Sequence, residues 1–345
     1  MQAFYQAVKR ELDKVNFDAL WPGFHAYPFA LYDDTQAVLD GVSMVRPAEF
    51  WANTALRFQG QLVAIYQVPA EDARDASSMA SLLVHEMFHA FQMDCGETRF
   101  PDDLSLAAAP LPAEALAWKA EEYRALAQAD LPRFRAARER RRAMAPEAVR
   151  EELMAETVEG MAQYVELTAL GQLSPEKRRE GLQACVRALA EPERLLDARR
   201  CAYHSGTLLL TAAAAQGLVF AHPIGMETRP VYDLIAGQIP AGDLPACPML
   251  APWQALVQEQ REHRAHQIQE FLRRPHRTVT GQFSICGYDP MNLWRQEELL
   301  FSTSYLALRG EGQEPVELQG QALLYMLPGS AHRCRGYVVA EQPAP

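Results

Sequence analysis

The chain has 345 residues, of which 49% are hydrophobic and 22% charged, and this composition excludes a disordered or fibrous protein. Its formal net charge of −11 argues against nucleic acid as a main partner. No apolar run reaches the length of a membrane-spanning helix, so we expect no membrane partner either.

The first seventy residues predict a helix followed by short strands. Residues 1–14 mix charged and apolar side chains at helical spacing and lack the apolar region of a secretory signal. Strand-like runs follow at residues 29–32 and 61–66, between Pro and Gly residues. The second run comes shortly before the next helix. We expect the strand near 61–66 to lie at the edge of a sheet and to pair with an extended peptide. An ordinary interior strand is an equal alternative.

Residues 77–95 predict one buried helix. Ser77 or Ser78 can cap its start, and Gly96 follows its end. Apolar residues cover most of its circumference, which is typical of a helix inside a core.

The most specific motif of the chain lies on this helix, where His85, Glu86 and His89 form an HExxH pattern. Residues four apart on a helix point the same way, so both imidazoles can reach one metal ion at about 2.0–2.1 Å. Glu86 is rotated by roughly 100° and lies beside such a metal, which suits a general base acting on a zinc-bound water.

A catalytic zinc needs a third protein ligand, and the predicted helix at residues 147–171 offers acidic candidates. Glu156 and Glu159 lie one turn apart and compete for this role, whereas Glu166 is a weaker candidate. If Glu156 is not the ligand, it can accept a hydrogen bond from a zinc-bound histidine.

Together, HExxH on one helix and Glu159-Gly160-x-Ala162-x-Tyr164 on a later one resemble the gluzincin branch of the zincin metallopeptidases. The resemblance is clear over about a third of the chain. It implies one Zn²⁺ per chain bound by His85, His89 and Glu159, with Glu86 as the general base. Where thermolysin-like enzymes carry an acidic residue that orients a histidine ligand, this chain has Gln163, whose amide oxygen can accept the same hydrogen bond.

An oxyanion donor is expected in the helix that starts near Cys201. Tyr203 and His204 are the catalytic candidates in this segment, because a phenol or an imidazole can donate to a developing negative charge. Simple packing of Tyr203 and surface exposure of His204 are the alternative.

The rest of the chain is predicted to be helical up to residue 274 and strand-rich from residue 276. A basic run between residues 133 and 142 is predicted to be a solvated helix face. The cysteines show no CxxC pair, which favours free thiols in a reducing cytoplasm. They are Cys95, Cys185, Cys201, Cys247, Cys286 and Cys334.

The sequence therefore predicts a mainly helical α+β protein with a zincin-like metallopeptidase domain at residues 1–275 and a small antiparallel β module at residues 276–345. The expected activity is zinc-dependent hydrolysis of peptide bonds in a peptide or protein substrate, in the cytoplasm. Two alternatives remain: a non-catalytic zinc protein that binds peptides or uses the metal structurally, and a zinc hydrolase of a non-peptide amide or ester.

Overall fold

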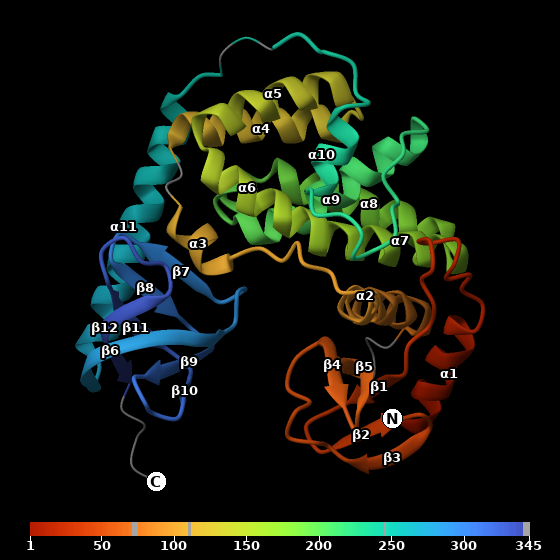
Figure 1. The fold of residues 1–345 in the computed structure, drawn as a ribbon, viewed down its shortest axis with the longest axis horizontal. Coiled ribbons are helices and arrows are strands. Elements are labelled where there is room, and N and C mark those ends of the chain that lie inside the picture. Colours follow the sequence, from red (N-terminus) through yellow and green to blue (C-terminus); the bar gives the residue numbers. More distant parts are fainter. Residues whose placement is uncertain (71–74, 110–111, 245, 247, 341–345) are drawn as a thin grey trace.

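A computed structural model describes residues 1–70, 75–109, 112–244, 246 and 248–340. Two β-sheets, one from each end of the chain, lie on either side below a body of helices (Figure 1). The fold is thus mixed α and β with an antiparallel C-terminal sheet, as the sequence predicted. No helix in the described part of the chain is long and apolar enough to cross a membrane.

The N-terminal sheet has five strands in the order β3-β2-β1-β5-β4. β5 pairs with β1 in parallel and with β4 in antiparallel register, so it is an interior strand. The edge-strand prediction for residues 61–66 is therefore wrong, and β4 occupies the edge instead. The elements of this part are α1 (Gln2–Leu12), β1 (Phe29–Tyr32), β2 (Gln36–Leu39), β3 (Val42–Val45), β4 (Thr54–Phe58) and β5 (Gln61–Gln67).

Helix α2 (Ala76–Asp94) lies between this sheet and the helical body, within one residue of its predicted bounds (Figure 1). Its N-terminus is capped by Asp75, whose carboxylate accepts a hydrogen bond from the backbone N–H of Ser78 at 2.7 Å. Asp75 thus takes the capping role that the sequence suggested for Ser77 or Ser78. Apolar side chains all round α2 are buried, among them Leu83 and Phe88.

The described residues between 112 and 274 are helical apart from the connecting loops, as predicted. The predicted third-ligand helix is a continuous run of α6, a π-helical turn η2 and α7. The helices are α3 (Asp103–Ala108), α4 (Ala113–Ala127), α5 (Leu131–Met144), α6 (Pro146–Ala155), η2 (Glu156–Gly160), α7 (Met161–Leu173), α8 (Pro175–Ala190), the 3₁₀ turn η3 (Pro192–Leu196), α9 (Ala198–Ala215), α10 (Val231–Ala236) and α11 (Ala251–Arg273).

The basic run on α5 is not a solvated face, because Arg138 and Arg141 are fully buried. Arg138 makes a two-pronged ion pair with Glu156, at 2.5 and 2.7 Å. Arg141 contacts Glu122 and also Glu152, the latter at 2.7 Å. Carboxylates from α4, α6 and η2 compensate these charges, and a buried guanidinium requires such partners.

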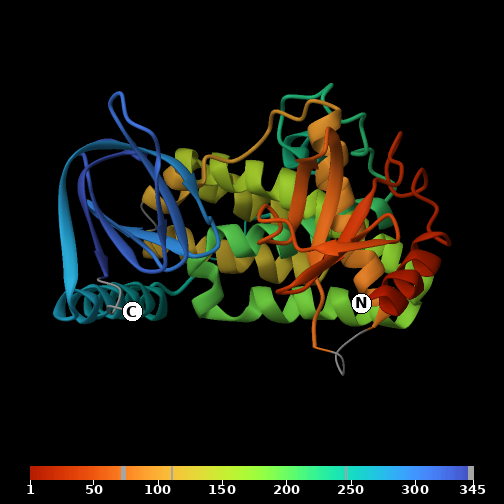
Figure 2. The ribbon, with the colours of Figure 1, turned by 90° about the horizontal axis from the view of Figure 1, so that it is seen from below.

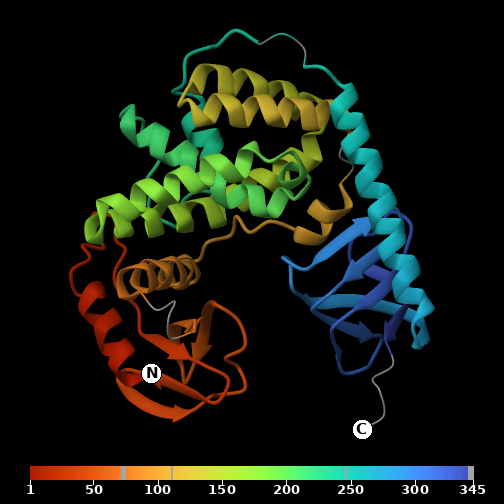
Figure 3. The ribbon, with the colours of Figure 1, turned by 180° about the vertical axis from the view of Figure 1, so that it is seen from behind.

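The C-terminal sheet has seven strands in the order β10-β9-β6-β12-β11-β8-β7, all antiparallel. Helix α11 packs along one side of it, where the ring of Phe271 meets that of Phe301 at 5.3 Å (Figure 3). Residues 341–345 of the predicted module lie outside the described residues. The strands are β6 (His276–Tyr288), β7 (Leu293–Gln296), β8 (Leu299–Ser302), β9 (Tyr305–Gly310), β10 (Val316–Gln319), β11 (Ala322–Met326) and β12 (Arg333–Ala340).

An aromatic contact joins a loop of the N-terminal part to the C-terminal sheet. The ring of Trp51, in the loop before β4, lies 5.6 Å from that of Tyr305 in β9. Seen from below, the C-terminal sheet lies at one end of the helical body, and the N-terminal sheet lies in front of the helices toward the other end (Figure 2).

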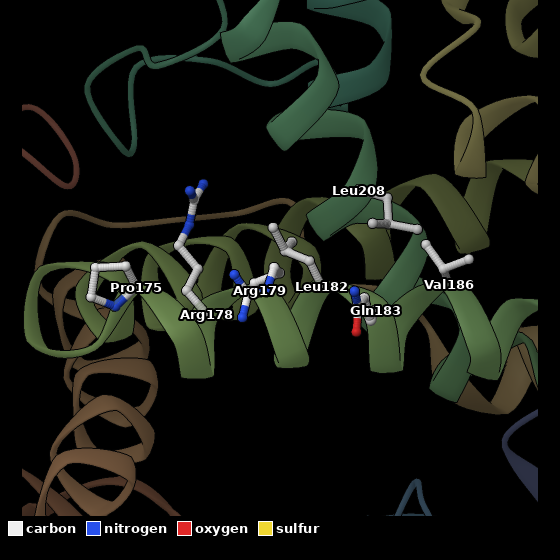
Figure 4. Close-up of a pocket in the computed structure, with 7 residues that line it drawn as sticks. All are labelled: Pro175, Arg178, Arg179, Leu182, Gln183, Val186 and Leu208. Atoms are coloured by element: carbon white, nitrogen blue, oxygen red, sulfur yellow. The ribbon is translucent and has the colours of Figure 1, made fainter.

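A small cavity of about 350 Å³ lies on the other side of α7 from α2, along α8 (Figure 4). Its lining is mostly apolar, with Leu182 and Val186 from α8 and Leu208 from α9. Arg178 also lines it and packs its methylenes on Gly171, where a Cβ atom would come within 2.4 Å. None of the predicted site residues reaches this cavity.

The described cysteines, Cys95, Cys185, Cys201, Cys286 and Cys334, are all free, which agrees with the expectation of unpaired thiols. Cys247 lies outside the described residues.

Candidate metal centre

Three predicted ligands come together between α2 and the π turn η2. His85 and His89 project from α2, and their Nε2 atoms are 3.1 Å apart. The Oε2 atom of Glu159 lies 3.2 Å from Nε2 of His89 and 3.7 Å from Nε2 of His85. In the described part of the chain, these three residues form the one group with metal-ligand geometry.

This triangle fits a tetrahedral zinc ion. Ligand atoms about 2.0–2.1 Å from a tetrahedral ion lie about 3.3 Å from one another. The three observed separations, 3.1, 3.2 and 3.7 Å, bracket that value without any rearrangement of side chains. With three protein ligands, one tetrahedral position is left for water or substrate.

The outer nitrogen of each imidazole has a hydrogen-bond acceptor that fixes its proton. Nδ1 of His85 donates to Oε2 of Glu166 at 3.0 Å, and Nδ1 of His89 donates to Oε1 of Gln92 at 2.8 Å. The Gln92 amide cannot be reversed, because its Nε2 donates to the carbonyl of Val158. In the neutral form of each ring, the inner Nε2 therefore carries the lone pair and faces Glu159. Burial disfavours the charged form of His85, but Glu159 and Glu166 outweigh it and raise the pKa of this imidazole well above its usual value.

Glu159 completes a set of three acceptors that face one another. Its Oε1 accepts a hydrogen bond from Arg199, whereas its buried Oε2 has no hydrogen-bond partner. Burial opposes the charge of Glu159, and the histidines and Arg199 outweigh it and hold the pKa of this carboxyl well below its usual range. Three lone-pair atoms this close repel one another unless a proton on a histidine or a metal cation lies between them.

The orienting residues differ from the prediction. Gln163 does not reach either histidine; its Oε1 accepts a hydrogen bond from Thr207 at 3.1 Å. Glu166 takes the orienting role for His85 instead. It lies seven residues after Glu159, two turns along the same side of a helix, so the spacing carried a signal for it.

Glu156 is not at the site. Its carboxylate is buried against Arg138 and the hydroxyl of Ser205, on the side of η2 that faces α5. The π turn is the physical reason, because its wider coil separates two residues that an α-helix would keep on one face.

Glu86 is buried beside the three ligands, as its position in the motif predicted. Burial raises the pKa of this carboxyl above its usual value, and the charges of His85 and His89 oppose the rise. Tyr66, at the end of β5, lies near this carboxyl: burial and the charges of Glu86 and Glu166 raise the pKa of the Tyr66 hydroxyl to about 12. A carboxyl with a raised pKa is suited to accept and return a proton near neutral pH.

Of the two expected donors, Tyr203 reaches the site and His204 does not. The Tyr203 ring stacks on His85, with centroids 5.9 Å apart and planes at 6°. Its hydroxyl contacts Glu159, and burial and that charge raise its pKa above the usual value, which keeps it a neutral donor. His204 instead has Arg194 and Glu191 as its charged neighbours, because it lies one residue further around α9.

Arg199 and Asp103 are site residues that the sequence analysis missed. Arg199 binds Glu159 and also Oδ1 of Asp103, the latter at 2.8 Å. It lies four residues before Tyr203 and hence on the same face of α9, which is the signal that would have found it. Asp103, on α3, is distant in sequence and had no local signal.

Comparisons with protein-family models, curated proteins and solved structures found no match.

Proposed function

We propose that this chain is a zinc metallopeptidase of the gluzincin type, with one Zn²⁺ held by His85, His89 and Glu159. The observation that supports it best is the triangle of three acceptor atoms. Their other hydrogen-bonding atoms are already engaged by Glu166, Gln92 and Arg199, so their remaining lone pairs converge on one point. A zinc ion bound there would polarise a peptide carbonyl and lower the pKa of a water molecule toward 7.

Other residues of the chain would transfer the proton, stabilise the developing negative charge and orient the histidine ligands. Glu86 accepts a proton from the attacking water and returns it to the leaving amine, which its raised pKa favours. Tyr203 donates a hydrogen bond to the oxygen that becomes negative, since its hydroxyl stays neutral beside His85. Glu166 and Gln92 keep both imidazoles in the tautomer that leaves Nε2 free.

A peptide substrate suits the surroundings of the site. β4 is an edge strand, and it packs against α2, which carries the histidines. An extended peptide can add to such an edge by backbone hydrogen bonds. Strand β4 therefore replaces the region near residue 61 as the proposed pairing strand. The free thiols of the described cysteines agree with action in a reducing cytoplasm.

The non-catalytic alternative is less well supported. A structural zinc site is normally closed by four protein ligands. Among the described residues, the group has three members, and the carboxyl with a raised pKa lies beside them. Hydrolysis of a non-peptide amide or ester would use the same residues, and the choice of substrates in the assay separates the two.

The test is Glu86→Gln, compared with His89→Ala. Glu86→Gln keeps the shape of the side chain and removes the base, so zinc content should stay at about one per chain while turnover falls by about 10²-fold or more. His89→Ala should lose the zinc itself. Metal analysis and mass spectrometry of a digested peptide library measure both. Unchanged cleavage by Glu86→Gln, or full zinc in His89→Ala, would disprove the proposal.

A further inference from the structure

A large cavity of about 920 Å³ opens where the helical body meets the C-terminal sheet. Its walls come from α3, η3, α9, α11 and the loop and strand around β7. In Figure 3, α11 runs down beside the sheet and forms one side of this junction. Asp103 and Arg199 line the cavity, and Arg199 binds the proposed zinc ligand Glu159. The cavity therefore begins at the wall of the metal centre.

Two half-buried guanidinium groups of this cavity donate hydrogen bonds only to backbone carbonyls among the described residues. Arg264 lies over the ring of Trp294 at 5.1 Å and donates to the carbonyl of Arg295 at 3.1 Å. Its buried Nε has no hydrogen-bond partner. Arg295 donates to the carbonyls of Glu297 and Ser330, each at 2.7 Å. Among the described residues, neither guanidinium forms an ion pair.

Arg194, Arg199 and Arg200, which also line the cavity, already have carboxylate partners, whereas the exposed Arg261 has no ion pair among the described residues. Arg200 pairs with Asp197 at 2.5 Å, and Arg194 pairs with Glu191 at 3.3 Å. The Asp197 carboxylate also caps α9 by accepting a hydrogen bond from the backbone N–H of Arg200, so its oxygens already have partners other than Arg264. Burial accordingly lowers the pKa of Arg264 below its ordinary value, with only a partial counter-effect from Asp197. A half-buried guanidinium without an anion is costly, and a bound anion would remove the cost.

We propose that this cavity is a substrate pocket for a carboxylate, held between Arg264 and Arg295. The proposal rests on the proposed peptidase function. It predicts that the enzyme prefers peptide substrates that carry a negative charge some residues from the cleaved bond. An acidic side chain and a free C-terminus supply the same carboxylate. A planar guanidinium recognises either by paired hydrogen bonds, so the recognition chemistry is shared.

The test measures binding by calorimetry to the full chain carrying Glu86→Gln, which leaves peptides uncut. The probes are blocked alanine hexapeptides that contain one Glu or one Gln, each with an amidated C-terminus, and an all-alanine hexapeptide as its free acid or amide. A carboxylate that gains charge-assisted hydrogen bonds should bind about 10- to 100-fold more tightly than its neutral counterpart. Tighter binding of the Glu peptide than of the Gln peptide identifies a side-chain carboxylate as the ligand. Tighter binding of the all-alanine acid than of its amide identifies a C-terminal carboxylate.

Arg264→Gln should bring the dissociation constants of the charged and neutral peptides within about twofold of each other. Arg295→Gln should also reduce the preference for the charged peptide. Arg273→Gln, an exposed position on the same helix, should leave it unchanged. Equal binding of charged and neutral peptides by the otherwise unaltered protein would overturn the proposal, whatever the variants do. The preference should persist after a chelator removes metal, so a wrong metal assignment and a wrong pocket give different results.

Discussion

Tyr203 is the residue on which the proposed chemistry depends most after the ligands themselves. It stacks on His85, and its hydroxyl contacts Glu159, so it lies within reach of a substrate oxygen at the metal centre. His204 is its neighbour in sequence but faces Arg194 and Glu191. The two residues therefore form a matched pair for a test of the oxyanion donor.

We expect Tyr203→Phe to lower turnover by about 10²- to 10³-fold with little change in zinc content or KM, because a donor to the transition state is lost while the ring remains. His204→Ala should keep at least half of the parent turnover. Steady-state kinetics on one peptide, with metal analysis of each variant, measure both effects. If Tyr203→Phe keeps full activity, the donor is another group, and Arg199 becomes the first candidate.

At the scale of elements, the close crossing of η2 and α9 aligns the site. Gly160 and Gly206 face each other there, and a Cβ atom on Gly206 would lie 2.6 Å from the Cα of Gly160 and 2.9 Å from the Glu156 carbonyl oxygen. Both neighbours are backbone, so the two helices must separate to admit a side chain. Glu159 on η2 and Tyr203 on α9 would then move apart.

We expect Gly206→Ala to reduce the free energy of unfolding by about 1–3 kcal/mol, the usual cost of overpacking, and to weaken zinc binding. Gly237→Ala is the control: Gly237 has a right-handed helical backbone and no atom near the position of an added Cβ. It should be neutral or slightly stabilising. Urea unfolding and a chelator competition give the two readouts, and equal stability of both variants would contradict this account of the crossing.

Local patterns predicted the elements well, but they could not predict partners across the fold. The helix expected at residues 77–95 and the candidate ligands on it follow from spacing along one segment. The interior position of β5 depends on parallel pairing with β1, from more than thirty residues earlier in the chain, which no pattern within the strand encodes. Glu156 stayed a rival to Glu159 because the π turn between them has no sequence signature of its own.

At the scale of the whole molecule, a buried charge network holds the helices behind the proposed metal centre together. Lys119 and Glu122 come from α4, Arg138 and Arg141 from α5, and all four are fully buried. Carboxylates of α6 and η2 complete the network. A run of arginines predicts a solvated face unless its partners are known, and here they come from three other segments. This is why the sequence analysis was wrong about α5.

The network makes stability depend on pH in a definite direction. Glu152 pairs with Arg141 at 2.7 Å and Lys119 at 3.2 Å. Burial alone would raise the pKa of this carboxyl, but the two cations outweigh it and lower the pKa to about 2. An unfolded Glu titrates near 4.3, so the folded state favours the ionised form. The contribution of Glu152 is therefore complete above about pH 4.3 and is lost as the pH falls toward 2.

We expect Glu152→Gln to cost roughly 3 kcal/mol of unfolding free energy at pH 7, because it leaves Lys119 buried without its anion. The difference between parent and variant should shrink steadily between pH 4.5 and pH 2.5, while other acidic groups titrate alike in both proteins and cancel. Urea unfolding at half-unit steps of pH, in chelator so that metal binding does not contribute, measures this difference. Glu176→Gln, at an exposed position on α8, should match the parent at every pH. A difference in unfolding free energy between parent and Glu152→Gln that stays constant down to pH 2.5 would mean that Glu152 does not titrate with the network. The acid sensitivity of the helical body would then arise from another carboxylate.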